Sequence, residues 1–144
     1  MSLPAFKKPS ADRSKNMSAI RCAGNKTTER RLISLLRSSA VKGWRPHPSG
    51  IFGNPDVLIR KEAVAIFVDG CFWHGCPKCG HIPRTNRAYW RAKIKRNKQR
   101  DDLVSRTLRT AGYGVLRVRE CQLREKPTRC LNRIVRMLRR RSRR

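Results

Sequence analysis

Cysteines gather in one short stretch of this chain of 144 residues. Cys76 and Cys79 form a Cys-x-x-Cys pair, Cys71 lies five residues upstream of it, and Cys121 follows an expected strand that would return to the same place. Four thiolates in a tetrahedral arrangement make a closed structural zinc site. The stretch 70–84 has few large apolar side chains, so a metal would supply folding energy that packing does not.

Other interpretations of the cysteines stay open. A redox-active Cys-x-x-Cys pair usually begins a helix, which lowers the thiol pKa, whereas here Gly80 follows the pair and a third cysteine precedes it. Cys130 is an alternative fourth ligand, although it lies beside the apolar positions of the last expected helix. His74 and His81 are alternative zinc ligands, and Cys22 is expected to be structural or exposed.

The chain has only nine acidic residues, and two of them flank an apolar run. Asp56 begins an expected strand and Asp69 ends the next one, so adjacent strands would bring their carboxylates together as oxygen ligands for Mg²⁺. In nucleases such an ion activates water and stabilises the phosphoryl transition state. A Pro-Asp pair is also common in ordinary turns, so Asp56 alone does not identify the site.

The long helix expected over 86–111 gives an independent indication. Asn97 and Asp101 share one helical face with four apolar residues, namely Trp90, Ile94, Val104 and Leu108. Polar groups on a core-facing side need partners, which a metal or an active-site cleft would provide. The alternative is a helix whose middle rises to the surface.

The loop residues Phe72, Trp73 and His74 lie between glycines. Histidine titrates near neutral pH and suits proton transfer to or from water, although a zinc ligand or an ordinary loop histidine explains His74 equally well. Both aromatic side chains would project from a loop, and such apolar groups insert between base steps in proteins that deform DNA. Otherwise they would cover the zinc site.

The net charge of +27, from 36 basic against nine acidic residues, favours a polyanionic partner. Nucleic acid is the first choice, because phosphate neutralisation releases counterions. An anionic membrane surface is the rival, but we see no lipidation motif, no apolar run of about 20 residues and no signal peptide. We therefore expect a cytoplasmic protein whose cysteines do not form disulfides.

Apolar periodicity outlines the elements around these residues. It predicts helices over 26–40, over 86–111 and from Pro127 onwards, with strands over 44–47, 56–60, 63–68 and 115–118. This order predicts a small mixed α/β domain. We expect a flexible basic arm over 1–12, the domain over 13–138, and a tail over 139–144 that is too charged to fold alone.

Taken together, these motifs resemble those of very-short-patch repair (Vsr-type) DNA mismatch endonucleases. The most specific is the string Phe-Val-Asp-Gly-Cys-Phe-Trp-His-Gly-Cys over 67–76, and further similar pieces lie at 13–20, 29–32, 55–56, 89–101 and 118–121. The resemblance implies a restriction-endonuclease-like fold with a central mixed sheet flanked by helices and a structural zinc. It also implies Mg²⁺-dependent nicking of one strand beside a T:G mismatch, the product of 5-methylcytosine deamination.

The resemblance also implies roles by position. The Mg²⁺ ligands correspond to Asp56 and the backbone carbonyl of Val68. The proposed general base corresponds to His74, the aspartate that supports the metal–water network to Asp101, and the acidic residue of the first helix to Glu29.

Recognition and zinc binding are assigned in the same way. A wedge that intercalates at the mismatch corresponds to Met17, Phe72 and Trp73, and Asn97 is expected at the DNA. The zinc ligands correspond to Cys71, Cys76, Cys79 and Cys121.

The chain departs from the family pattern at Val68-Asp69, where some members carry Thr-His. A histidine contact to the phosphate would then be absent, and Asp69 is expected to bind the metal directly. Some members also have histidine where Cys76 stands, which is a conservative change for zinc.

The implied partner is duplex DNA with a T:G mismatch, bound by a monomer in the bacterial nucleoid, with mismatch-repair proteins as further candidate partners. Three other functions stay open: a sequence-specific nicking or restriction enzyme without mismatch selectivity, a noncatalytic zinc DNA-binding module, and a ribosomal or RNA-binding protein.

Overall fold

The computed structural model describes residues 2–5 and 26–144, so Met17 and Cys22 lie outside the described residues. The helices are α2 (Lys26–Arg37), α3 (Arg87–Thr110), α4 (Glu120–Glu125) and α5 (Pro127–Ser142). The strands are β1 (Trp44–Pro46), β2 (Val57–Ile59), β3 (Val64–Asp69) and β4 (Gly114–Arg119). Within these ranges, no helix combines the length and the apolarity needed to cross a membrane.

The four strands form one mixed sheet in the order β1-β2-β3-β4. β1 pairs with β2 and β2 with β3 in antiparallel fashion, whereas β3 and β4 are parallel and set Phe67 opposite Arg117 and Asp69 opposite Arg119. A parallel pair needs a long crossover, which α3 supplies. The carboxyl ends of β3 and β4 therefore lie side by side at one edge of the sheet.

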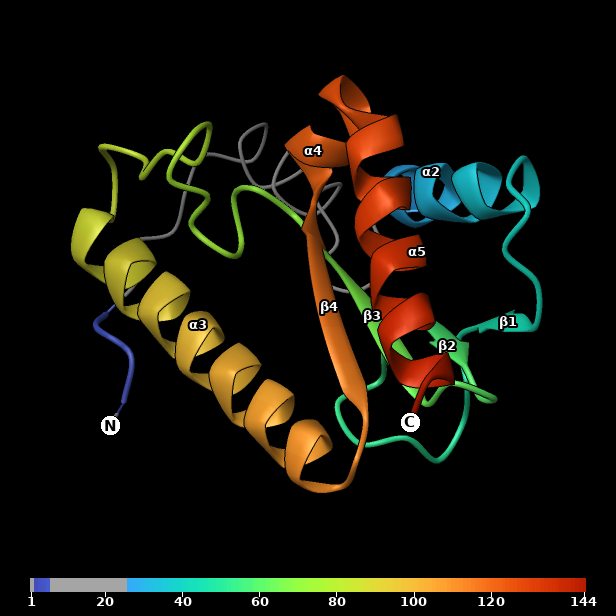
Figure 1. Cartoon of the computed structure of the whole chain (residues 1–144). Helices are drawn as coiled ribbons and strands as arrows, with labels where there is room; N and C mark the ends of the chain where they lie inside the picture. Colours follow the sequence, from blue (N-terminus) through green and yellow to red (C-terminus); the bar gives the residue numbers. More distant parts are fainter. Residues whose placement is uncertain (1, 6–25) are drawn as a thin grey trace.

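Helices cover both faces of this sheet (Figure 1). α3 packs on one face through Val104 and Leu108, which meet Ala65, Phe67 and Val115. On the other face, α2 and α5 share a core with the strands that includes the fully buried residues Leu32, Leu36, Val57, Ile59, Val64, Ile66, Val118 and Ile134. The expected mixed sheet flanked by helices is confirmed.

The short helix α4 was not expected from the sequence. It begins directly after β4 and carries the buried residues Cys121 and Leu123. At six residues it is too short for a visible 3.6-residue repeat, and tertiary contacts hold it in place. Because Cys121 lies in its first turn, α4 sets the position of a cysteine that the sequence placed only in relation to a strand.

The last helix extends further than expected. α5 begins with Pro127 in its first turn, as predicted, but it continues through the arginine-rich end to Ser142. Arg141 helps to hold that end, since its Nε donates to the backbone oxygen of Glu62 at 2.6 Å and its Nη2 donates to that of Gly112. The charged segment prolongs a helix whose buried residues are Cys130 and Ile134.

Candidate active site

A cleft of about 790 Å³ opens at the carboxyl end of β3 and is lined by residues of α2, α3 and the loop after β3. Among the residues that the structure describes, five acidic ones line it, namely Glu29, Asp56, Asp69, Asp101 and Glu120. Lys93 and Arg100 of α3 line the same cleft. In a protein with a net charge of +27, this gathering of carboxylates indicates a site for a cation or for proton transfer.

Asp56 is held at one side of the cleft by the backbone of β3. Its amide donates to the oxygen of Ile66 at 3.0 Å, and its Oδ2 accepts a hydrogen bond from the amide of Val68 at 2.6 Å. The pKa of Asp56 is raised from 3.8 to about 6, mainly by burial; the nearby Glu29 adds to this rise and the Val68 amide opposes it. A half-buried carboxylate beside a second acid is an environment that a divalent cation would relieve.

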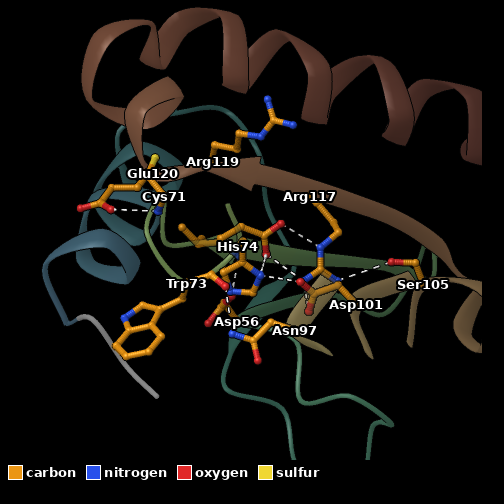
Figure 2. A network of polar contacts seen from close by, with 12 residues as sticks. Asp56, Cys71, Trp73, His74, Asn97, Asp101, Ser105, Arg117, Arg119 and Glu120 are labelled. Atoms are coloured by element: carbon orange, nitrogen blue, oxygen red, sulfur yellow. Dashed lines mark hydrogen bonds and ion pairs between the residues drawn. The ribbon is translucent and has the colours of Figure 1, made fainter. Parts of the chain in front are cut away.

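A second polar group lines the same cleft, where His74, Asp101 and Asp69 meet; Figure 2 shows His74 beside Asp101. The Nδ1 of His74 forms a very short contact with Asp101 Oδ2 and lies 3.8 Å from Asp69 Oδ1. An ionised carboxylate only accepts hydrogen bonds, so we assign the proton to Nδ1. The lone pair of this imidazole is then on Nε2, as a proton acceptor requires.

Asp69, which the sequence predicts to bind a metal directly, lies with His74 and Asp101 in a group of side chains that could hold a metal ion, and it is also paired with an arginine. Its two oxygens accept hydrogen bonds from Nε and Nη2 of Arg117, at 2.9 and 2.7 Å. A guanidinium therefore already supplies the positive charge that a metal would bring to this carboxylate.

Arg117 and His47 are among the cleft residues to which the sequence analysis assigned no role. Arg117 had a detectable signal, because it is a charged residue in the middle of a strand with buried Leu116 and Val118 on either side. His47 had none beyond its type; its Nε2 lies 3.5 Å from Glu29 Oε2, and its side chain is 60% exposed.

The aromatic residues form a cluster at the mouth of the cleft. The rings of Phe72 and Trp73 pack edge to face at 5.0 Å between centroids, and both contact the buried Trp90 of α3, at 5.2 and 5.8 Å. Asn97 donates from Nδ2 to the carbonyl of Trp73 at 2.9 Å. Neither loop aromatic is fully exposed; each is half-buried and held in place by α3.

The structure brings together the four cysteines singled out in the sequence, Cys71, Cys76, Cys79 and Cys121, with sulfur atoms all within 4.8 Å of one another. Backbone hydrogen bonds close the loop around them, from Cys76 N to Cys71 O at 2.9 Å and from Gly80 N to Cys76 O at 2.9 Å. This donor set and spacing suit a tetrahedral metal ion such as zinc.

The alternative ligands lie elsewhere. Cys130 is buried in the core beside α2 and the sheet, as its position on the last helix suggested. His74 faces Asp101 rather than the sulfur atoms, and the ring of His81 packs on Phe72 at 5.9 Å between centroids.

The chain is similar to a known protein family and to several known enzymes. Residues 6–79, just over half of the chain, match the family described as DNA mismatch endonuclease Vsr. The Type II nicking enzyme V.NaeI of Lentzea aerocolonigenes is 42% identical over 118 residues, which cover 76% of this chain and 68% of that enzyme. The DNA mismatch endonuclease Vsr of Escherichia coli (strain K12) is 37% identical over 116 residues, covering 79% and 72%. The Type II nicking enzyme V.NmeAIP of Neisseria meningitidis is 37% identical over 98 residues, covering 67% and 69%.

Proposed function

Because the chain belongs to the Vsr family of endonucleases, we propose that it nicks one strand of duplex DNA beside a T:G mismatch by Mg²⁺-dependent hydrolysis. The observation that carries this proposal is the single cleft that unites Asp56, His74 and Asp101 with the aromatic pair Phe72 and Trp73. Such a mismatch arises by deamination of 5-methylcytosine.

We assign the catalytic cation to Asp56 and the backbone carbonyl of Val68. In the part of the chain that the structure describes, no lysine or arginine forms an ion pair with Asp56, and its raised pKa reflects burial and the nearby Glu29. Mg²⁺ bound there would polarise the scissile phosphate and activate water. Glu29 is a second acidic residue close to this cation site. Both oxygens of Asp69 accept hydrogen bonds from Arg117.

His74 acts as the general base in this proposal. With the proton on Nδ1, Asp101 accepts a hydrogen bond from Nδ1–H, which fixes the tautomer and leaves Nε2 to take a proton from the attacking water. In-line attack of this water on phosphorus would break the P–O3′ bond on the opposite side, which leaves a 3′-hydroxyl and a 5′-phosphate. The role of Asp101 is to orient the imidazole and to stabilise it once it is protonated.

The aromatic pair serves mismatch recognition. Inserting an apolar side chain between base pairs requires unstacking them, and the free-energy cost of unstacking is lowest at a mispair. The rings of Phe72 and Trp73 pack against Trp90, and the side chain of Asn97 donates a hydrogen bond to the backbone carbonyl of Trp73. These contacts hold the two aromatic residues in place before DNA binds. Met17, outside the described residues, would complete the wedge, and Lys93 and Arg100 are placed to contact phosphates.

The four-cysteine cluster binds structural zinc in this proposal. Burial raises the pKa of Cys76, but hydrogen bonds from the amides of Cys79 and Lys78 lower it to about 6, which favours the thiolate that zinc requires. The site connects the loop after β3 to the start of α4 through Cys121. Zinc would therefore hold the loop that carries the aromatic pair and His74.

A second candidate is sequence-specific nicking without mismatch selectivity, because two of the relatives named above are Type II nicking enzymes. Both candidates place the protein on bacterial DNA, and we therefore assign it to the nucleoid of a bacterial cytoplasm. It acts there as a monomer, and mismatch-repair proteins are its candidate partners.

The deciding experiment is a panel of duplexes that carry T:G in varied flanks, each with a T:A control, cut by the wild type and by Asp56→Ala with Mg²⁺. We expect nicking of T:G duplexes by the wild type and none by the variant, which keeps its affinity for DNA. Equal nicking of T:A controls would favour the second candidate. A wild type that binds DNA but cuts no duplex with any divalent metal would leave only a noncatalytic zinc module, and tighter binding to structured RNA than to mismatched duplex would favour an RNA-binding protein.

A further inference from the structure

Arg117 is a largely buried basic residue that lines the cleft. It lies in the middle of β4, and its guanidinium carbon is 4.7 Å from the centre of the Phe67 ring on the neighbouring strand. Only 22% of its side chain is exposed. Keeping a half-buried arginine there costs desolvation, so its hydrogen-bond partners must hold it in place.

Those partners are the carboxylates of Asp69 and Asp101, both close to Nδ1 of His74; Figure 2 shows Arg117 directed toward Asp101. Arg117 donates to both oxygens of Asp69, and its Nη2 also lies 3.0 Å from Asp101 Oδ1. Its Nη1 lies 3.5 Å from Ser105 Oγ on α3. One planar group therefore connects the end of β3 to the middle of α3.

The two oxygens of Asp101 have separate partners. Oδ1 contacts Arg117, whereas Oδ2 contacts Nδ1 of His74. Rotation of the carboxylate would break both contacts at once, so Arg117 fixes the plane in which Asp101 meets the imidazole. Without that guanidinium, Asp69 and Asp101 would be adjacent acids that repel each other and compete for the same ring nitrogen.

We propose that Arg117 is a positioning residue of the nuclease, which joins Asp69 to Asp101 and thereby holds His74 with its proton on Nδ1 and Nε2 available to water. This inference rests on the proposed function, because it gives His74 the role of base. It also accounts for Asp69, whose task is to orient Arg117 rather than to bind the catalytic cation.

An arginine suits this task better than a lysine. Its planar fork presents several donors in fixed directions and can hold two carboxylates at once. An ammonium group is a compact charge on a flexible stem, and it would hold one of them at a time. Arg117→Lys should therefore keep the charge and lose part of the alignment.

The first test separates turnover from DNA binding. For Arg117→Met we expect kcat for nicking a T:G duplex to fall about 10- to 100-fold while KM changes less than about threefold, the size of effect seen when an orienting group is removed. Arg117→Lys should fall in between. Arg119→Met is the matched control, since it removes the same charge from the same strand at an exposed side chain that points away from this network.

A double variant tests whether Arg117 only neutralises Asp69. In Arg117→Met combined with Asp69→Asn, the excess negative charge is gone, but Asp101 still lacks its partner. We expect kcat to stay low. Recovery of wild-type kcat in the double variant would overturn the inference.

The second test does not depend on cutting. The chain has three histidines, so ¹⁵N chemical shifts of His74 can be assigned with the help of His47→Gln and His81→Gln. In zinc-loaded protein without Mg²⁺ we expect the Nδ1–H tautomer in the wild type and a mixture of tautomers in Arg117→Met.

These readouts separate the two hypotheses. If the wild type nicks DNA and Arg117→Met matches it in kcat and in His74 shifts, the inference fails and the proposed function stands. If the wild type cuts nothing, the proposed function fails, and the tautomer measurement still decides whether Arg117 positions His74. Should Arg117→Met not fold, as judged by lost zinc, a folded Arg117→Lys with wild-type kcat and shifts would overturn the inference.

Discussion

The carboxylate of Asp56 accepts the amide proton of Val68 at 2.6 Å, although the two residues are 12 positions apart. This bond ties the loop before β2 to the end of β3. It fixes the direction of a carboxylate whose ionised form is disfavoured by burial and by the nearby Glu29. The raised pKa of Asp56 should therefore affect the free energy of unfolding as well as the rate of DNA nicking.

Asp56 should make stability fall as the pH rises when Mg²⁺ is absent. Its pKa of about 6 in the folded protein exceeds the ordinary 3.8, so the folded state binds more protons than the unfolded state between about pH 4 and 6. Over that range we expect the free energy of unfolding of the wild type to drop by about 1–2 kcal/mol relative to Asp56→Asn, with partial exposure limiting the effect. Denaturant titrations at several pH values measure this difference.

Mg²⁺ should reverse that loss in the wild type alone. The ion binds the ionised carboxylate, so its stabilising effect should grow as the pH rises through 6 and should be absent in Asp56→Asn. Thermal melts with and without Mg²⁺ at pH 5 and 7.5 test this. Parallel pH profiles for the two proteins would contradict the assignment of the cation to Asp56.

Removing one exposed sulfur should release the zinc. Cys79 is exposed, so Cys79→Ser costs little packing, and any large effect reports the metal. We expect zinc content near zero and a free energy of unfolding lower by more than about 3 kcal/mol. Cys130→Ala is the control: it makes a small cavity in the core but should keep one zinc per chain by elemental analysis. Zinc retained by Cys79→Ser would exclude the four-cysteine site.

Gly53 should tolerate no side chain. It has a φ of +78°, and a Cβ there would lie 2.2 Å from Cγ1 of Val104. Gly53→Ala should cost about 2–4 kcal/mol from backbone strain and overlap together. Gly50 has a φ of +74° with nothing within 4 Å, so Gly50→Ala should cost only about 1 kcal/mol of strain. Equal losses, measured by urea denaturation, would show that contact with Val104 contributes nothing.

Trp73 should govern selectivity more than rate. We expect Trp73→Ala to lower the ratio of nicking at T:G over T:A by about tenfold, since an inserted aromatic side chain contributes on the order of 1–3 kcal/mol. Phe52→Ala is the matched control, because Phe52 is an aromatic residue 54% exposed and outside the cleft. If both variants keep the wild-type ratio, the wedge lies elsewhere.

Much of the candidate site could be identified from the sequence, because local spacing encodes it. The Cys-x-x-Cys pair, the apolar run of β3 and the 3.6-residue repeat of α3 each depend on residues within a few turns or one strand. The α3 repeat correctly put Asn97 and Asp101 on the face that holds Trp90 and Val104. The repeat of side chains along a helix or strand can be recognised in the sequence without knowing which element packs against it.

The arginine partner of Asp69 could be identified only from the tertiary structure. Asp69 and Arg117 are 48 positions apart, and they meet because β3 and β4 pair in parallel with Phe67 opposite Arg117. A shift of one residue in that register would turn Arg117 to the other face of the sheet. The sequence by itself thus determined which residues have chemistry to offer, whereas strand register decided which charges meet, because that pairing depends on packing across the whole sheet.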